Sequence, residues 1–415
     1  MELSEALRAA AARGLSEARE LLCDLIRLPT VTGQEQPAVD YLLTRCQELQ
    51  GQAELVPIPS GITDDIDYSF GDVAFDYHDR PNLIFQRRGS GGGQSLIIST
   101  HLDVVPAADW AEAFAPRVEG DHVVGRGACD AKGQAAAVWL ALWLLDAVGV
   151  RTKGTVEAQF VIEEEIGGNG ALGIILAGRR ADAALVVEGT DLQVHPANRG
   201  AIWYRIRIEG KSVHMGRIRE GISAHDKAME VIEILRRYER RLMAESKGVP
   251  LFERYQQPVQ VNVGVVRAGD WPATVPGECL IEGGVGFLPN KRMADVKRDL
   301  EEAIRGQADE WTRRHFTLDF PKLHNEAYQT DPGHPFVRAV AAACDEAGLK
   351  SEMFGWNVSC DARLYYHRGK MPTVVFGPGK PEQAHSRGER IAMSQIGEAA
   401  IAIALLIARW CEAAS

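Results

Sequence analysis

The sequence predicts an α/β protein, in which a smaller α+β domain is inserted into a large domain built on a mostly parallel β-sheet. The chain has 415 residues. A single hydrophobic core usually organises fewer residues than this, so the length indicates two domains. Up to about residue 196, short apolar runs bounded by glycine alternate with helical patterns, and this texture returns after residue 328. Alternating strands and charged helices fill the stretch between. We therefore assign residues 1–196 and 329–415 to the large domain and 197–328 to the inserted domain.

The expected elements of the large domain follow the βαβ order that produces parallel strands. The first 22 residues have the period of an amphipathic helix. The remaining expected elements are strands at Ser95–Ser99, Val156–Ile162, Ala183–Val187 and Thr373–Phe376, and helices at Gln134–Val148, Pro335 to Ala347 and Ser394 to Cys411.

The inserted domain is expected to contain an antiparallel sheet. An alternating strand at Ala201–Ile208 leads through a Gly-Lys-Ser-Val-His turn to a charged helix around Ala224–Arg241. Strand patterns at Val259–Val266 and Glu278–Phe287 follow, and then a helix from Met293 to about Arg313. This strand–helix–strand–strand–helix order is typical of a small α+β domain.

Composition and charge exclude several classes of protein. The net charge of −11, without a long basic run, argues against nucleic-acid binding. The acidic N-terminal stretch lacks the features of a signal peptide, and apolar stretches such as AAAVWLALWLL are too short to span a bilayer. The seven cysteines form no CxxC pair, which argues against a disulfide framework and a cysteine zinc site. We expect a cytoplasmic protein without a membrane partner.

Metal-ligand residue types follow the predicted strands of the large domain. Their positions are His101 and Asp103 after the first strand, Glu163, Glu164 and Glu165 after the second, Glu188 after the third, His385 after the last, and Asp130 before a helix. Because ligands bind at the carboxyl ends of strands in open α/β sheets, these side chains could converge on one crevice.

The chemistry that uses such a set is hydrolysis by paired divalent ions. Zinc accepts histidine nitrogen and carboxylate oxygen, and two ions about 3.5–4 Å apart can share a carboxylate and hold a hydroxide between them. An unligated acid then shuttles protons, so one of Glu164 and Glu165 could bind metal while the other faces the water. Taken singly, each residue has an ordinary interpretation: a hydrogen-bonded His101, an N-cap at Asp130, a solvated run of glutamates and an exposed His385.

A second pattern favours a different chemistry. Residues 168–173 match G-x-G-x-x-G after a predicted strand, and Glu188 follows Gly168 at the spacing of a dinucleotide-binding site. The three carboxylates from Glu163 to Glu165 would repel a pyrophosphate, however, and this interpretation leaves both histidines unused. An NAD(P)-dependent oxidoreductase is therefore a distant alternative.

Six motifs in order identify a family resemblance. They read S-T-H-L-D-V-V-P, G-R-G-A-C-D-A-K-G, E-E-E-I-G-G, V-V-E-G-T, G-K-S-V-H and F-G-P-G followed by A-H. This succession resembles the two-zinc metallopeptidases and deacylases that include acetylornithine deacetylase, succinyl-diaminopimelate desuccinylase and carboxypeptidase G. The resemblance covers roughly Leu25 to Ala408. It implies a zinc-peptidase-like catalytic domain with an inserted lid that forms a homodimer.

The resemblance also implies a role for each candidate residue. His101 and Glu188 would bind one zinc ion and Glu165 and His385 the other, with Asp130 bridging them, often before a cis peptide bond. Glu164 would be the general base, and Asp103 would orient the imidazole of His101. His214 would reach into the partner's site to stabilise an oxyanion, and Arg363 would grip a substrate carboxylate. Cobalt or manganese could take the place of zinc.

Departures from the family pattern concern the substrate. Many members have an arginine in the lid strand before a proline and an asparagine in the preceding glycine-rich loop. Neither residue occurs here at Gly283–Pro289 or Gly269–Pro276. Glu163 also replaces an aspartate of the pattern. The Asp- and Tyr-rich segment Pro59–Pro81 is insertion-like, and we expect a solvated loop rather than a pocket lining.

The function expected from the sequence is two-metal hydrolysis of an amide bond. The substrate would be a small N-acyl amino acid or related N-acyl amine, as in acetylornithine deacetylase, attacked by a metal-bridging hydroxide. A di- or carboxypeptidase with the same metal site is the alternative.

Overall fold

The computed structural model describes residues 2–70 and 75–413, and the chain divides into two compact units. Unit 1 comprises residues 1–197, 330–354 and 360–415, and unit 2 comprises residues 198–329 and 355–359. The short return of Gly355–Ser359 to unit 2 differs from the expected assignment of all residues after 328 to the large domain. Its backbone explains the difference, because Gly355 N donates to Leu251 O (2.8 Å) and Trp356 O accepts from Arg199 N (3.1 Å).

The main sheet of unit 1 has six strands in the order β1-β2-β6-β3-β7-β15. Their bounds are β1 (Gln52–Val56), β2 (Asn82–Arg87), β3 (Leu96–His101), β6 (Val156–Val161), β7 (Ala183–Val186) and β15 (Thr373–Val375). The four strands β6, β3, β7 and β15 are parallel, whereas β1 and β2 pair in the antiparallel sense at one edge. The α/β prediction is confirmed. The sheet is mixed because β1 and β2, which were not among the expected strands, pair in the antiparallel sense.

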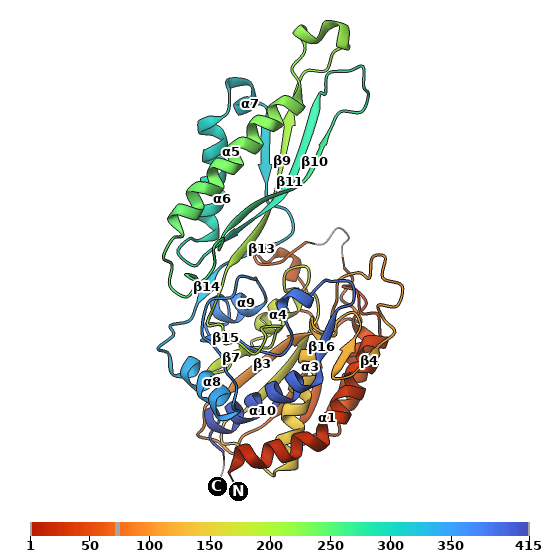
Figure 1. Ribbon diagram of the computed structural model, residues 1–415, viewed down its shortest axis with the longest axis vertical. Helices are drawn as coiled ribbons and strands as arrows, with labels where there is room; N and C mark the ends of the chain where they lie inside the picture. The colour runs from red at the N-terminus through yellow and green to blue at the C-terminus, as the bar shows by residue number, and fades with distance from the viewer. Residues whose placement is uncertain (1, 71–74, 414–415) are drawn as a thin grey trace. The chain divides into compact units, whose positions relative to one another are not determined.

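The helices of unit 1 are α1 (Leu3–Arg27), α2 (Gln36–Cys46), α3 (Lys132–Ala147), α4 (Asn169–Leu176), α8 (Pro335–Glu346), α9 (Ala362–His367) and α10 (Met393–Trp410). Helices α1, α3 and α10 pack against one another, and α10 also contacts α8 (Figure 1). Nearly every residue of α3 is buried, as expected for a helix that is apolar on all sides.

One helix of the described residues is long and apolar enough to cross a membrane, by length and composition alone. It is α10, and 72% of this helix is buried inside the fold. No such stretch is expected from the sequence, because its uninterrupted apolar runs are too short to span a bilayer. The burial of α10 among α1, α3 and α8 is that of a core helix.

A small antiparallel sheet in unit 1 brings two distant loops together. It has the order β16-β5-β4, with β4 (Arg117–Glu119), β5 (His122–Val124) and β16 (Arg390–Ala392). The register pairs Arg390 with Val124, so the loop before β16 lies beside the loop after β5. These loops carry His385 and Asp130. A single-turn η1 (Ile62–Asp64) and η3 (Pro381–Gln383) complete the unit.

Unit 2 is an antiparallel sheet with helices on one face. Its elements are β9 (Gly200–Glu209), β10 (Gln260–Ala268), β11 (Glu278–Phe287), β12 (Phe316–Asp319), β13 (His324–Asn325), η2 (Met215–Glu220), α5 (Ala224–Glu245), α6 (Met293–Gln307) and α7 (Glu310–Arg314), with β8 (Ala197–Asn198) and β14 (Tyr328–Gln329) at its ends. The sheet order is β10-β11-β9-β12, and β13 also pairs with β9. The helix expected up to Arg313 is two helices, because Asp309 starts a new one by accepting a hydrogen bond from Thr312 N (2.7 Å).

Candidate metal centre

The end of β3 and its two neighbours form the first group of potential metal ligands. His101 is the last residue of β3 and is almost fully buried. Its Nε2 lies 3.0 Å from Asp130 Oδ1 and 3.9 Å from Glu188 Oε1. Asp130 precedes α3, and Glu188 follows β7 by two residues. The parallel pairing of β3 with β7 places His101 and Glu188 at the same edge of the sheet.

A second group shares Asp130 with the first. His385 Nε2 lies 3.2 Å from Asp130 Oδ2 and 2.9 Å from Glu165 Oε2. In each group the three potential ligand atoms lie within 4.8 Å of one another. The buried Oε1 of Glu165 has no hydrogen-bond partner among the described residues. Histidine nitrogens, carboxylates and an unsatisfied buried oxygen around one shared aspartate fit two adjacent divalent ions. The peptide bond after Asp130 is cis.

Asp103 lies behind this centre and holds two of its strand ends. Its Oδ1 is 3.3 Å from Nδ1 of His101, and its main-chain oxygen is 3.0 Å from the same nitrogen. Its two carboxylate oxygens also accept hydrogen bonds from the backbone N–H groups of Glu164 (3.0 Å) and Glu165 (3.1 Å). These contacts are the ones through which Asp103 would orient the imidazole of His101, a role that stays a prediction. The anchoring of Glu164 and Glu165 was not expected from the sequence.

The electrostatics of the centre are those of many acids in a small buried volume. Burial raises the pKa of Glu164 and of Glu188 well above the ordinary value of a glutamate, with further contributions from neighbouring carboxylates. Burial and the nearby Asp130 raise the pKa of Glu165 to about 7. Hydrogen bonds to Asp130 and Glu165 raise the pKa of His385 to about 10. Such an arrangement favours either retained protons or bound cations.

Glu389 organises the loop that carries Asp130, and the sequence analysis missed it. Its carboxylate accepts hydrogen bonds from the backbone N–H groups of Gly127 (3.1 Å), Cys129 (2.8 Å) and Asp130 (3.0 Å), and from Nη1 of Arg126 (2.7 Å). Glu389 has no exposed surface. A single acid beside Arg390 was a weak signal, because its partners lie about 260 positions away in the sequence.

Asp361 was also missed, and it adds a buried acid near the centre. It is 3% exposed, and its Oδ2 has no hydrogen-bond partner among the described residues. Burial raises its pKa to about 7, against the opposing effect of Arg363. The guanidinium of Arg363 is buried, donates from Nη2 to Gly167 O (2.7 Å) and lies 3.9 Å from Asp67. The structure thus gives Arg363 partners within the protein, and its contact with a substrate carboxylate stays a prediction.

The described part of the segment at residues 59–81 is a largely solvated loop, as expected, but several of its side chains attach it to the fold. Tyr68 and Ser69 are buried, and Arg368 forms a two-pronged ion pair with Asp65 (2.6 Å) that also reaches Asp67 (2.7 Å). These buried side chains and ion pairs hold a segment of polar composition against the fold. Asp72, which the sequence analysis included in this segment, lies outside the described residues, and Asp64 lies in η1.

This segment also explains the glutamate at position 163. The carboxylate of Glu163 is buried, pairs with Arg80 (2.6 Å), and accepts hydrogen bonds from Tyr77 (2.7 Å) and Asn169 (2.9 Å). Glu163 adopts a left-handed backbone conformation with φ of 60°, which is unusual for a residue with a side chain. Three side-chain partners therefore fix the residue that directly precedes Glu164.

The same contacts disfavour dinucleotide binding at Gly168–Gly173. Helix α4 begins directly after Gly168 and contains Gly170 and Gly173, so a helix does start at this motif, as a dinucleotide site requires. However, Gly168 packs so closely against Asp361 that an added Cβ would lie 2.1 Å from its Oδ1. Glu163 is bonded to Asn169 at the first turn of the helix. Two carboxylates thus occupy the surroundings in which a pyrophosphate would need positive charge.

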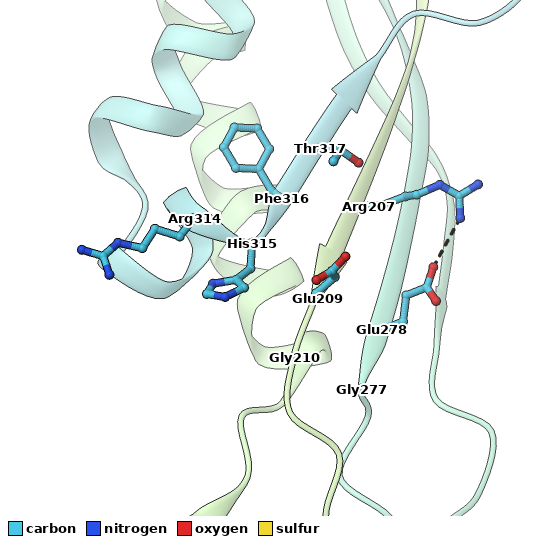
Figure 2. A pocket seen from close by; sticks show the side chains of 9 residues that line it. All are labelled: Arg207, Glu209, Gly210, Gly277, Glu278, Arg314, His315, Phe316 and Thr317. Carbon is cyan, nitrogen blue, oxygen red and sulfur yellow. Dashed lines mark hydrogen bonds and ion pairs between the residues drawn. The ribbon is translucent and has the colours of Figure 1, made fainter.

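His214 belongs to unit 2, where it is exposed and caps η2 by accepting a hydrogen bond from Gly216 N (3.1 Å) on its Nδ1. Its expected role in oxyanion stabilisation stays a prediction. A pocket of about 460 Å³ in unit 2 contains none of the candidate residues (Figure 2). It is lined by balanced charges, among them Arg207 and Glu278, which pair with each other at 3.3 Å.

A comparison with protein families agrees with this geometry. The model of "Peptidase family M20/M25/M40" matches residues 97–409, which include the strand ends and both groups of potential ligands. The chain belongs to this family. It is therefore a hydrolase of amide bonds with a candidate metal site, and the metallopeptidase and deacylase resemblance is confirmed.

Relatives of this M20 protein include deacylases and peptidases. The chain is 27% identical over 363 residues to N-formyl-4-amino-5-aminomethyl-2-methylpyrimidine deformylase of Bacillus subtilis, covering 81% of this chain and 84% of the relative. It is 27% identical over 345 residues to acetylornithine deacetylase of Myxococcus xanthus, covering 80% and 85%. Its fold matches a dinuclear metal-binding peptidase of the family from Bacillus subtilis, with a TM-score of 0.70, 19% identity and coverage of 97% and 100%.

Proposed function

We propose that this M20 protein removes a small N-acyl group from an amine, with two divalent ions, zinc above all, bound around Asp130. The observation that carries the proposal is the pair of ligand groups that share this aspartate, with Glu164 directly beside Glu165. In this proposal His101 and Glu188 hold one ion, and Glu165 and His385 hold the other. Bound ions would polarise the scissile carbonyl and lower the pKa of an attacking water.

Glu164 is the proton carrier in this proposal. It is held at the backbone by Asp103, and burial raises the pKa of its carboxylate, which favours uptake of a proton by this group. Glu164 would take a proton from the attacking water and pass it to the nitrogen of the leaving amine. His214 would stabilise the oxyanion, and Arg363 would bind a substrate carboxylate.

The deacylase assignment is favoured over a peptidase by the two relatives named above, which are a deformylase and a deacetylase. A di- or carboxypeptidase is the second candidate, favoured by the structural match to a dinuclear metal-binding peptidase. We also propose a homodimer formed through the lid, without nucleic-acid or membrane partners. A cytoplasmic location is consistent with seven free cysteines that are all buried.

The proposal is tested with a panel of N-formyl, N-acetyl and N-succinyl amines and amino acids, set against dipeptides. We expect turnover of at least one N-acyl compound at a higher kcat/KM than any dipeptide. The reverse order would establish the peptidase instead.

The role of Glu164 is tested by Glu164→Gln, which should keep the bound metal and lose about 10²- to 10⁴-fold in kcat. Glu157→Gln is the matched control, because Glu157 is a buried glutamate on β6 that bonds Gln159 and Arg179 instead of the centre. A Glu164→Gln variant as active as this control would show that another group carries the proton.

A further inference from the structure

One face of the sheet in unit 2 carries a row of arginines. On β9 the buried side chains of Ile202, Tyr204, Ile206 and Ile208 form the core face toward the helices. The alternate residues Trp203, Arg205 and Arg207 lie on the opposite face. Arg199, just before the strand, continues this alternation and lies beside Gly286 of β11.

Two of these arginines have a carboxylate partner on the neighbouring strand. Arg205 pairs with Glu282 (2.7 Å), which is directly opposite in the register. Arg207 pairs with Glu278 (3.3 Å), as Figure 2 shows. The residue directly opposite Arg207 is Leu280. Glu278 precedes Leu280 by two residues on β11, so the pair of Arg207 with Glu278 is diagonal.

The residue of β11 that lies diagonally opposite Arg199, as Glu278 lies to Arg207, is a glycine. Gly200 lies opposite Phe287, so the register continued by one residue sets Arg199 against Leu288, and the diagonal position is Gly286. A Cβ at Gly286 would lie 2.9 Å from Nη1 of Arg199 and 2.9 Å from Oε1 of Gln260. The glycine therefore leaves the space beside the strand that the guanidinium occupies.

Arg199 is left largely without partners for its charge. Among the described residues, its side chain donates to Gln260 Oε1 and forms no ion pair with a carboxylate. Its buried Nε has no hydrogen-bond partner within the described part of the chain. Burial accordingly lowers the pKa of Arg199, with Tyr255 opposing the effect. A half-buried cation without a counter-ion is costly unless an anion comes from outside the protein.

We propose that Arg199, with Gln260 beside it and Gly286 beneath it, binds the carboxylate of a small molecule. A guanidinium offers a planar pair of N–H donors that matches a carboxylate. Many members of the family have an arginine on the strand that corresponds to β11, and this chain has glycines there. Arg199, at the start of β9, supplies a guanidinium beside one of these glycines, Gly286. The carboxylate belongs either to a substrate, in which case the inference rests on the proposed function, or to a free acid, and two experiments separate these sources.

The first experiment measures binding alone. Succinate is titrated against the wild-type protein, Arg199→Ala, Gly286→Asp and the control Arg207→Ala, and the melting temperature is recorded. We expect succinate to raise the melting temperature of the wild type and of Arg207→Ala. It should have no effect on Arg199→Ala, or on Gly286→Asp, whose new carboxylate would occupy the guanidinium as Glu278 does for Arg207. Unchanged melting temperatures without succinate show that the variants fold.

The second experiment compares two substrates that differ only in charge, N-formylglycine and N-formylglycinamide. If the carboxylate belongs to the substrate, Arg199→Ala should lower kcat/KM for N-formylglycine about 10- to 100-fold and leave the amide within about 3-fold. If the wild type hydrolyses neither compound nor any other N-acyl amine, the proposed function fails and the binding experiment alone decides. Equal behaviour of Arg199→Ala and Arg207→Ala in both experiments would overturn the carboxylate site.

Discussion

Removing the metal should make the stability of this protein fall as the pH rises. Burial and Asp130 raise the pKa of Glu165 from 4.5 to about 7, and burial raises that of Asp361 from 3.8 to about 7. Between pH 4 and 7 the metal-free folded protein therefore binds more protons than the unfolded chain, so the free energy of unfolding decreases with increasing pH. His385, with its pKa raised from 6.5 to about 10, acts in the same direction above pH 6.5.

The magnitude is worked from Glu165, the acid with the smaller of the two shifts. A change from 4.5 to about 7 for Glu165 corresponds to about 3 kcal/mol, at about 1.4 kcal/mol per pH unit. Since one acid alone has this effect, the metal-free protein should melt several degrees lower at pH 8 than at pH 5. Bound divalent ions replace the protons as counter-charges, so the metal-loaded protein should lose much less stability.

The assay is thermal unfolding between pH 5 and pH 8, with chelator-treated protein compared with the same protein after zinc is restored. The difference between the two melting temperatures should widen as the pH rises. A metal-free protein that is more stable at pH 8 than at pH 5 would refute the electrostatic reasoning about Glu165 and Asp361.

Two further predictions concern the supports of the centre. In Glu389→Gln the side-chain amide cannot accept all four hydrogen bonds that the carboxylate accepts. The affinity for metal should therefore fall about 10- to 100-fold, while the circular dichroism spectrum stays that of the native protein. An unchanged affinity in a zinc competition titration would show that Glu389 does not support the centre. Arg368→Ala deletes the ion pairs to Asp65 and Asp67, so limited proteolysis should cut residues 59–81 faster, with Arg387→Ala, an exposed weak pair, as control. Equal cleavage rates in these two variants would show that the ion pairs do not hold the segment.

The strand ends of the centre could be predicted from the sequence because their signals are local. Apolar runs place His101 at the end of one buried strand and Glu165 in the turn that follows another, and parallel strands bring their carboxyl ends to one edge. The family resemblance supplied the order of the motifs. The fold class was therefore predictable. The antiparallel strands β1 and β2 were not predicted, because their apolar runs are short and their pairing joins residues about 30 positions apart.

The supporting residues could not be predicted, because their role depends on partners far away in the chain. Glu389 is an unremarkable acid until the pairing of β16 with β5 sets it under the loop of Asp130. The attachment of the segment at 59–81 to the fold depends on Arg368, which lies some 300 residues later and pairs with Asp65. The proposed role of Arg199 likewise depends on the strand register, which sets Gly286 beside it. Local composition contains none of these long-range pairings.

The number of metal ions per chain tests the two-metal centre most directly. Protein purified without chelator, and again after zinc is added and excess removed, is measured by inductively coupled plasma mass spectrometry alongside its amide hydrolysis. We predict two tightly bound divalent ions per chain in the fully active protein, and about one, with much reduced activity, in His385→Ala. Full activity with one ion or none per chain would contradict the shared role of Asp130.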